Sequence, residues 1–100
     1  MSFQTHFASH LRLAILRLLA EAPGYSLNAA IATDALASLG LSASRDQVRS
    51  EIAWLAEQGL VTGDELPGGL IVATLTERGL DVASGRATVP GVQRPAPKVV

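Results

Sequence analysis

The chain has 100 residues, 48% of them hydrophobic, and it contains no cysteine. This length suits one domain with a single modest core and is too short for two domains. The lack of cysteine excludes disulfides and thiolate-bound zinc. The sequence also lacks a GxSxG motif, an HExxH motif and a glycine-rich loop of the kind that binds phosphate. We therefore expect neither an enzyme nor a protein with a cofactor.

Charge is unevenly distributed along the chain, although the formal net charge is only −1. Arg86, Arg94 and Lys98 follow Gly85 with no acidic residue among them. The preceding part, residues 1–85, carries five basic and nine acidic residues, which gives it a net charge of −4. Affinity for a phosphate backbone comes mostly from clustered Lys and Arg. An acidic body is therefore unfavourable for a protein that binds nucleic acid.

Residues 3–21 predict a first helix, which ends at Ala22-Pro23-Gly24 because proline cannot continue the helical hydrogen bonds. Its apolar surface is wider than one stripe, so the helix needs partners on two sides. We expect one side to face the other helices and the other side to face a second subunit in a homodimer. The apolar run at residues 11–20 carries two arginines and is too short to cross a bilayer. This predicts a cytoplasmic protein with no membrane partner.

Two histidines, His6 and His10, lie four residues apart and would share one face of this helix. A zinc site needs more ligands than these two. We therefore expect no metal site and interpret the pair as surface or interface residues.

A second helix is predicted from Ser26, as its N-cap, to about Leu39. Gly40 is a suitable C-cap, and residues 41–43 form a short turn into the next helix. Two helices joined by a short linker, the second one capped by serine, are typical of a helix-turn-helix.

The clearest pattern in the chain is the helix predicted at residues 44–58. Ser44 and Gln47 form a capping box at its start, and Gly59 stands where a left-handed residue ends a helix. The apolar positions between these signals recur on one face, at Val48, Ile52 and Leu55.

Residues 60–75 predict a β-hairpin with its turn at Pro67-Gly68-Gly69. Two strands alone are marginally stable, so we expect the hairpin to lie on the helices. Thr76 then caps a short helix that runs through Ala83. The remaining residues, 86–100, contain three prolines and no periodicity, which is typical of an extended or disordered tail.

The helix at residues 44–58 and the Gly-Leu-Val that follows it resemble the recognition helix and wing entry of winged helix-turn-helix regulators, in particular the ArsR, MarR and PadR-like groups. The matching positions are Val48, Ile52, Leu55, Gly59, Leu60 and Val61. The segment LTERGLDVA at residues 75–83 is similar to the Leu-Thr-x-x-Gly motif that begins the last helix of MarR and PadR-like proteins. The resemblance covers about residues 8–84. The tail sequence VPGVQRP is similar to that of small proteins from Mu-like phages and prophages.

This resemblance implies a mainly α fold in residues 1–85, with a three-helix core, a two-stranded wing and a short C-terminal helix. It also implies a small transcription regulator that binds double-stranded DNA sequence-specifically, with the helix at residues 44–58 in the major groove. The residues expected to contact DNA are Ser44, Arg45, Gln47, Arg49 and Ser50 on that helix and Arg86, Arg94 and Lys98 in the tail.

The charges near these positions support an alternative. Asp46, Glu51 and Glu57 lie on the same helix and would repel phosphate. Arg45 and Arg49 would then only solvate the helix, with Asp46 paired to Arg49. The predicted wing, residues 62–71, contains two acids and no Lys or Arg, so it has no cation for a minor groove.

The roles of the tail and of Trp54 are left open by the sequence. The tail cations are candidates to replace the missing wing contacts, and the alternatives are a solvated terminus or a strap on a partner subunit. Trp54 falls away from the apolar stripe of its helix, and we expect the wing and its neighbours to cover it, the alternative being exposure for a partner. The second hypothesis for function is thus a winged helix that serves as a protein-interaction or assembly module without binding DNA.

Overall fold

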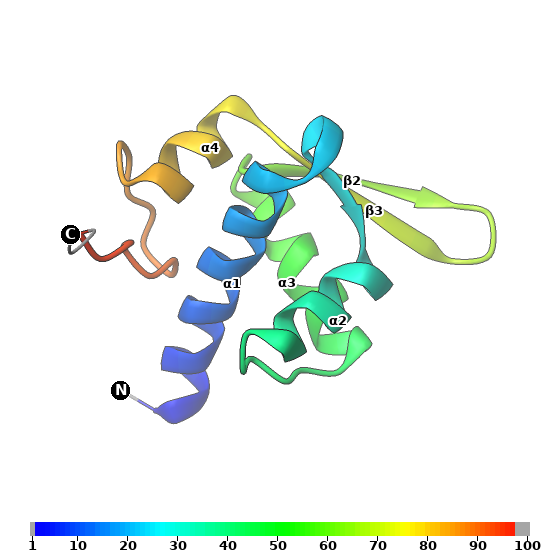
Figure 1. Ribbon diagram of the computed structural model, residues 1–100, viewed down its shortest axis with the longest axis horizontal. Helices are drawn as coiled ribbons and strands as arrows, with labels where there is room; N and C mark the ends of the chain where they lie inside the picture. The colour runs from blue at the N-terminus through cyan, green and yellow to red at the C-terminus, as the bar shows by residue number, and fades with distance from the viewer. Residues whose placement is uncertain (1, 98–100) are drawn as a thin grey trace.

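The computed structural model describes residues 2–97 and has the predicted mainly α fold of a winged helix-turn-helix (Figure 1). The elements in chain order are α1 (Phe3–Glu21), a 3₁₀ turn (Pro23–Tyr25), β1 (Ser26–Asn28), α2 (Ala29–Ser38), α3 (Arg45–Glu57), β2 (Val61–Leu66), β3 (Leu70–Leu75) and α4 (Glu77–Ser84). The sheet is antiparallel with the order β1-β3-β2, so it has one strand more than predicted. Within the described residues, no helix is both long and apolar enough to cross a membrane.

Helix α1 is the support on which the other elements pack, and its predicted bounds are confirmed. The hydroxyl of Ser2 caps it by accepting a hydrogen bond from Thr5 N at 3.2 Å. The helix contacts α2, α3, α4 and β3. Its side chains in the core are Leu11, Leu13, Ile15, Leu16 and Leu19. Residues 3–10 include no fully buried side chain, and Phe7 is half-buried against the edge of the core.

Helix α2 begins later than predicted. Its N-cap is Asn28, whose side-chain oxygen accepts a hydrogen bond from Ile31 N at 2.8 Å. Ser26 instead starts β1, and its hydroxyl hydrogen-bonds to the Thr74 hydroxyl of β3 at 2.6 Å. The sequence could not distinguish Ser26 from Asn28 as the N-cap, because serine and asparagine are equally favourable there. It also could not predict β1, because a strand of three residues is too short to show a hydrophobic period. The pairing with β3 therefore decided where the helix starts, and the local sequence did not contain that information.

The turn between α2 and α3 has the predicted form. Gly40 adopts a φ of 81°, and Leu41 N donates to Leu36 O at 2.8 Å, which closes the end of α2 in a Schellman-type turn. Ser44 then caps α3, because its Oγ accepts a hydrogen bond from Gln47 N at 3.0 Å. The predicted core positions of α3 are all buried: Val48, Ile52 and Leu55.

Strands β2 and β3 form the wing, a hairpin that projects from the helices (Figure 1). The turn residues Gly68 and Gly69 both have positive φ, which explains the two consecutive glycines. The wing is anchored at its base by Val61 and Ala73, which are buried, while residues 62–70 are exposed. The hairpin therefore lies on the helices only at one end.

Residues 86–97 are part of the domain rather than a separate tail. They form neither helix nor strand, but Val89 and Val92 are buried in the common core. Gln93 N donates to the carbonyl oxygen of Ser9 on α1 at 3.1 Å. Short apolar residues between prolines have no period, so their burial could not be predicted from the sequence. Lys98 lies outside the described residues.

Candidate nucleic-acid interface

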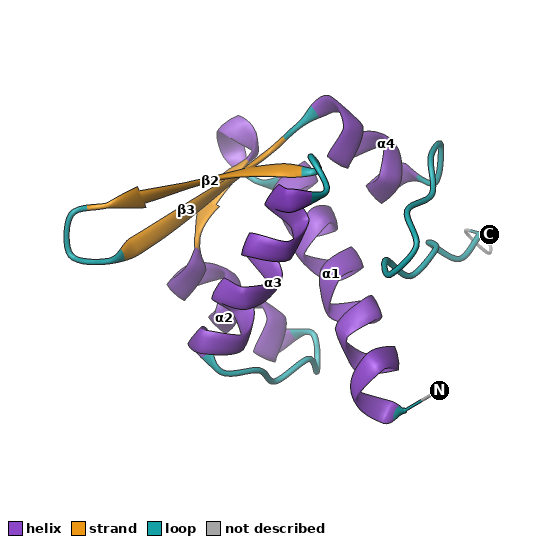
Figure 2. Cartoon of the chain, turned by 180° about the vertical axis from the view of Figure 1, so that it is seen from behind, coloured by secondary structure: helices purple, strands orange, loops and turns teal. Residues whose placement is uncertain are grey.

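Helix α3 presents one face to solvent, with the wing on one side of it and α1 and residues 86–97 on the other (Figure 2). On the wing side, a Cβ at Gly63 would lie 3.7 Å from a methyl group of Ile52, and on the tail side a Cβ at Gly91 would lie 2.9 Å from the indole of Trp54. The exposed side chains of the helix are Arg45, Asp46, Arg49, Ser50, Ala53 and Glu57. The predicted recognition helix is thus accessible along its length.

Arg45 and Arg49 lie one turn apart in the N-terminal half of α3, and both are exposed. With Asp46 they line a hollow of about 400 Å³ that is closed by the start of α2 and by the wing tip. The positive end of the α3 dipole lies at the same place. This is the region of α3 at which cationic groups gather, and an anionic group of a ligand would be favoured there.

Ser44 and Gln47 are partly engaged in capping. The structure contains the half of the predicted capping box in which Gln47 N donates to Ser44 Oγ. That bond occupies the Ser44 hydroxyl, whereas it uses only the backbone of Gln47. Gln47 is half-buried and Ser50 is exposed. Of these three predicted contacts, Ser44 and Ser50 are exposed, and Ser44 is the one whose side chain already caps the helix.

Glu51 does not lie on the exposed face, although the sequence placed it among the acids that would repel phosphate. It is 8% exposed, and its carboxylate accepts a hydrogen bond from Arg12 Nε at 2.6 Å. Arg12 comes from α1, and the long sequence separation hid this pair from reasoning along a single helix. The pair removes one negative charge from the candidate interface.

Arg12 also accounts for the position of Trp54. Its guanidinium lies 3.9 Å from the centre of the Trp54 ring, and its Nη1 donates to Gly91 O at 3.0 Å. Gly91 has a φ of 97°, and an added Cβ would lie 2.9 Å from the indole. The tryptophan is therefore half-buried by the domain itself, as expected, and the cover comes from Arg12 and the tail.

The wing contributes acidic groups to the edge of the interface. Arg49 Nη2 lies 4.0 Å from Glu65 Oε1, and the two side chains are 45% and 68% exposed. This is a weak surface ion pair, and it involves Glu65 rather than Asp46, the partner considered under the alternative. Asp64 is exposed on the same strand. Glu65 is thus a competitor for any anion that approaches Arg49.

The tail cations are separated from the arginines of α3. Arg86 and Arg94 are both exposed, but they follow the path of residues 86–97 past α4 and α1 (Figure 2). They lie on the opposite flank of α3 from the wing. The structure therefore brings together Arg45, Arg49 and Ser50, and it holds the tail cations on another part of the surface.

The two histidines of α1 are neighbours. Their Nε2 atoms are 3.2 Å apart and their ring centres are 4.6 Å apart. Among residues 2–97, no group of three or more His, Cys, Asp or Glu side chains is arranged to hold a metal ion. The pair is accounted for by a hydrogen bond between the two rings.

Solved structures with this fold include RosR from H. salinarum. One RosR structure aligns with a TM-score of 0.63 and 20% identity over 74% of this chain and 66% of RosR. The complex structure hsRosR-S1 aligns with a TM-score of 0.64 and 18% identity over 81% of this chain and 70% of that chain. At this level of identity the likeness establishes the winged-helix fold alone. The chain spans about two thirds of the length of RosR.

Two sequence relatives cover nearly the whole chain, whereas no protein-family model matches it. An uncharacterized protein of Haemophilus influenzae is 42% identical over 95 residues, which are 90% of this chain and 92% of the relative. Gp26 of Escherichia phage Mu, also an uncharacterized protein, is 52% identical over 87 residues, which are 87% of this chain and 88% of gp26. The predicted relation to small proteins of Mu-like phages is confirmed, and the chain belongs to the same family as gp26 of phage Mu.

Proposed function

We propose that this protein binds double-stranded DNA as a small transcription regulator, with α3 in the major groove. The observation that carries the proposal is the exposed face of α3, which offers Arg45, Arg49 and Ser50 while Arg12 holds Glu51 inside the protein. Arginine reads guanine through two parallel hydrogen bonds, and serine can bond to any base edge. The winged-helix fold supports this geometry, because it places such a helix beside a projecting hairpin.

In this proposal the protein acts as a homodimer on a two-fold symmetric site. A dimer makes twice as many phosphate contacts as one copy. This raises the affinity for DNA of a chain whose net charge is only −1. Arg86 and Arg94 contact the backbone on the flank of α3 that faces away from the wing. They supply the cations that the wing lacks.

The test begins with selection from a pool of random duplex DNA at low salt, followed by sequencing of the retained fraction. On the selected sequence, Arg49→Ala should weaken binding about tenfold and relax specificity at one base position if it reads a base. Arg78→Ala is the matched control, since Arg78 is exposed on α4 and carries the same charge. Binding is measured by fluorescence anisotropy over a series of salt concentrations. Equal losses for the two variants would contradict a specific role for α3.

A second candidate function, a protein-interaction module, is favoured by the wing. Its exposed surface combines Asp64 and Glu65 with the side chains of Leu66 and Leu70, which are 44% and 38% exposed at the tip. A projecting acidic and apolar hairpin is better suited to a protein than to a DNA minor groove. Failure of the protein to retain any duplex from the random pool at low salt would favour this second function.

A further inference from the structure

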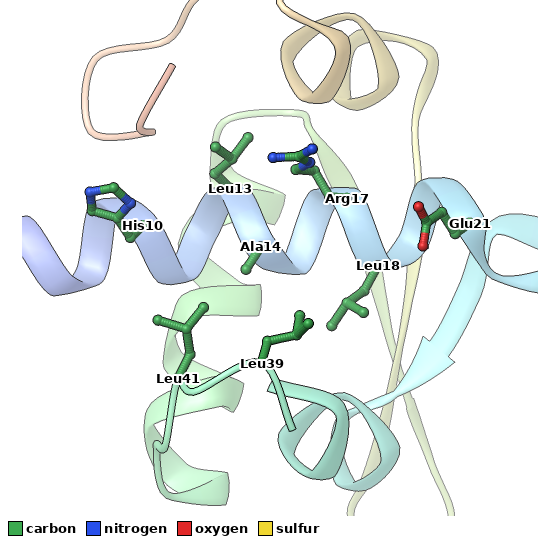
Figure 3. A pocket seen from close by; sticks show the side chains of 8 residues that line it. All are labelled: His10, Leu13, Ala14, Arg17, Leu18, Glu21, Leu39 and Leu41. Atoms are coloured by element: carbon green, nitrogen blue, oxygen red, sulfur yellow. The ribbon is translucent and has the colours of Figure 1, made fainter. Parts of the chain in front are cut away.

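One surface at the edge of the core lies outside the candidate interface. It is an open groove of about 460 Å³ along α1, called here the α1 groove (Figure 3). Its lining residues are His10, Leu13, Ala14, Arg17, Leu18 and Glu21 of α1 and Leu39 and Leu41 of the turn after α2. Leu39 is 60% exposed in its wall. Figure 3 shows Leu39 and Leu41 directed towards α1 across the groove from Ala14 and Leu18.

The same helix carries two aromatic rings near its N-terminus, of which Phe3 is exposed and Phe7 is half-buried. Phe3 and Phe7 stack with their ring centres 5.9 Å apart, and Phe3 is 78% exposed. They lie in the first two turns of α1, which contain no fully buried side chain. The positions 3, 7, 14, 18 and 21 share one face of a helix. The rings and the α1 groove therefore lie along one stripe of α1, with the rings at its N-terminal end and His10 between them and Ala14.

We propose that a second copy of this chain covers the stripe, with its α1 antiparallel to the first, so that Phe3 and Phe7 of each copy fill the α1 groove of the other. A two-fold axis near His10 brings Phe3 over Leu18, beside Leu39, and Phe7 over Ala14 of the second copy. The small side chain of Ala14 leaves space for a ring. Each copy supplies the same pair of rings and the same groove, which is the self-complementarity that a two-fold interface requires.

Charge favours the same arrangement. Helix α1 has no acidic residue in its first turn and no basic residue in its last turn, where Glu21 stands instead. A carboxylate at a helix C-terminus is unfavourable for its own helix dipole and favourable beside the N-terminus of another helix. Antiparallel pairing puts Glu21 beside the first turn of the second copy. A parallel pair would bring the two Glu21 carboxylates together.

Among residues 2–97, the segment after α4 leaves this stripe open. Residues 86–97 cross α1 at Ser9 and Arg12, on a different face from Phe7 and Ala14. The pairing also leaves the exposed face of α3 open. The α1 pairing rests on the proposed function in that it describes the dimer of the proposed regulator. Its test measures dimerisation in the absence of DNA, so the dimer and the DNA binding can each be disproved separately.

The test is sedimentation equilibrium of the full chain and of single variants. Phe3→Asp and Leu39→Lys each change an exposed side chain, one in the ring pair and one in the groove wall, so both should fold with unchanged circular dichroism. Each change enters the two-fold interface twice, and we expect each to weaken dimerisation at least about 100-fold. Leu80→Asp is the matched control, because Leu80 is 39% exposed on α4, and it should leave dimerisation unchanged.

A mixture of the two variants makes the test specific for this geometry. A heterodimer of Phe3→Asp with Leu39→Lys retains one intact pairing of rings and groove, and in the other pairing the aspartate meets the lysine. The mixture should therefore associate at concentrations at which each variant alone is monomeric. A monomeric wild-type chain at about 100 µM, a dimer that neither variant weakens, or a mixture that stays monomeric would each overturn the proposal.

Discussion

Gly79 illustrates how one residue without a side chain holds α4 against the end of α3. A Cβ at this position would overlap the carbonyl oxygen of Leu60 and lie 2.7 Å from a methyl group of Leu75. Thr76 completes the joint: its hydroxyl accepts a hydrogen bond from Gly79 N at 3.0 Å and donates to Gly59 O at 2.8 Å. The Leu-Thr-x-x-Gly pattern thus encodes a capped helix that starts in contact with the preceding backbone.

In the substitution Gly79→Ala, helix propensity and packing have opposite effects on the free energy of unfolding. Gly79 lies inside a helix, where alanine is intrinsically more favourable by about 1 kcal/mol. The overlap with backbone at Leu60 cannot be relieved by a side-chain rotation, so we expect a net loss of about 3 kcal/mol in the free energy of unfolding. Urea denaturation measures this change. Arg78→Ala, one residue earlier and exposed, should change stability by less than about 0.5 kcal/mol. A more stable Gly79→Ala protein would refute the close contact.

At the level of elements, Arg12 joins three segments that are distant in sequence. It bonds to Glu51, stacks on Trp54 and donates to the carbonyl oxygen of Gly91. Helix α3 and the tail are therefore held by the same side chain of α1. The tail acts as a packed element although it has no regular secondary structure.

The tail contact predicts a spectroscopic change on truncation. Removal of residues 86–100 takes Val89 and Val92 out of the core, which should lower the free energy of unfolding by about 3 kcal/mol. It also uncovers one side of Trp54, the only tryptophan, so its fluorescence emission should shift to longer wavelength. Removal of residues 96–100 is the control and should change neither quantity, since Ala96 and Pro97 are exposed. An unchanged emission in the longer truncation would show that the tail does not cover the indole.

The elements that the sequence predicted are those with local signals. Helix α1, helix α3 and the hairpin each have a period, a cap or a turn glycine within a few residues, and their bounds agree with the structure to within a residue or two. Strand β1 and the packed tail depend on partners elsewhere in the chain, as does the burial of Glu51 by Arg12. For the candidate interface, the sequence predicted the positions of Arg45 and Arg49 on α3, but it could not predict which acids share their surface.

At the level of the whole molecule, charge differs between the two ends of the long axis, which measures 41 Å. The wing lies at one end with Asp64 and Glu65, and residues 86–97 lie towards the other with Arg86 and Arg94 (Figure 1). A DNA duplex bound along α3 would meet repulsion from the wing and attraction from the tail. The net affinity then depends on where each charge lies and not only on the total.

The substitution Glu65→Lys tests this dependence on position. It changes the net charge by two units, removes the competitor beside Arg49 and places a cation on the wing, so we expect about tenfold tighter binding to duplex DNA and a salt dependence steeper by about one unit. Glu77→Lys on α4 makes the same change in net charge away from the wing, and it should alter affinity less than threefold, roughly the effect of long-range attraction that salt screens. Anisotropy titrations of both variants at several salt concentrations supply the comparison. Equal gains would mean that only net charge acts and that the wing does not approach the duplex. If neither variant binds DNA, the acidic wing is better explained as a surface for a protein partner.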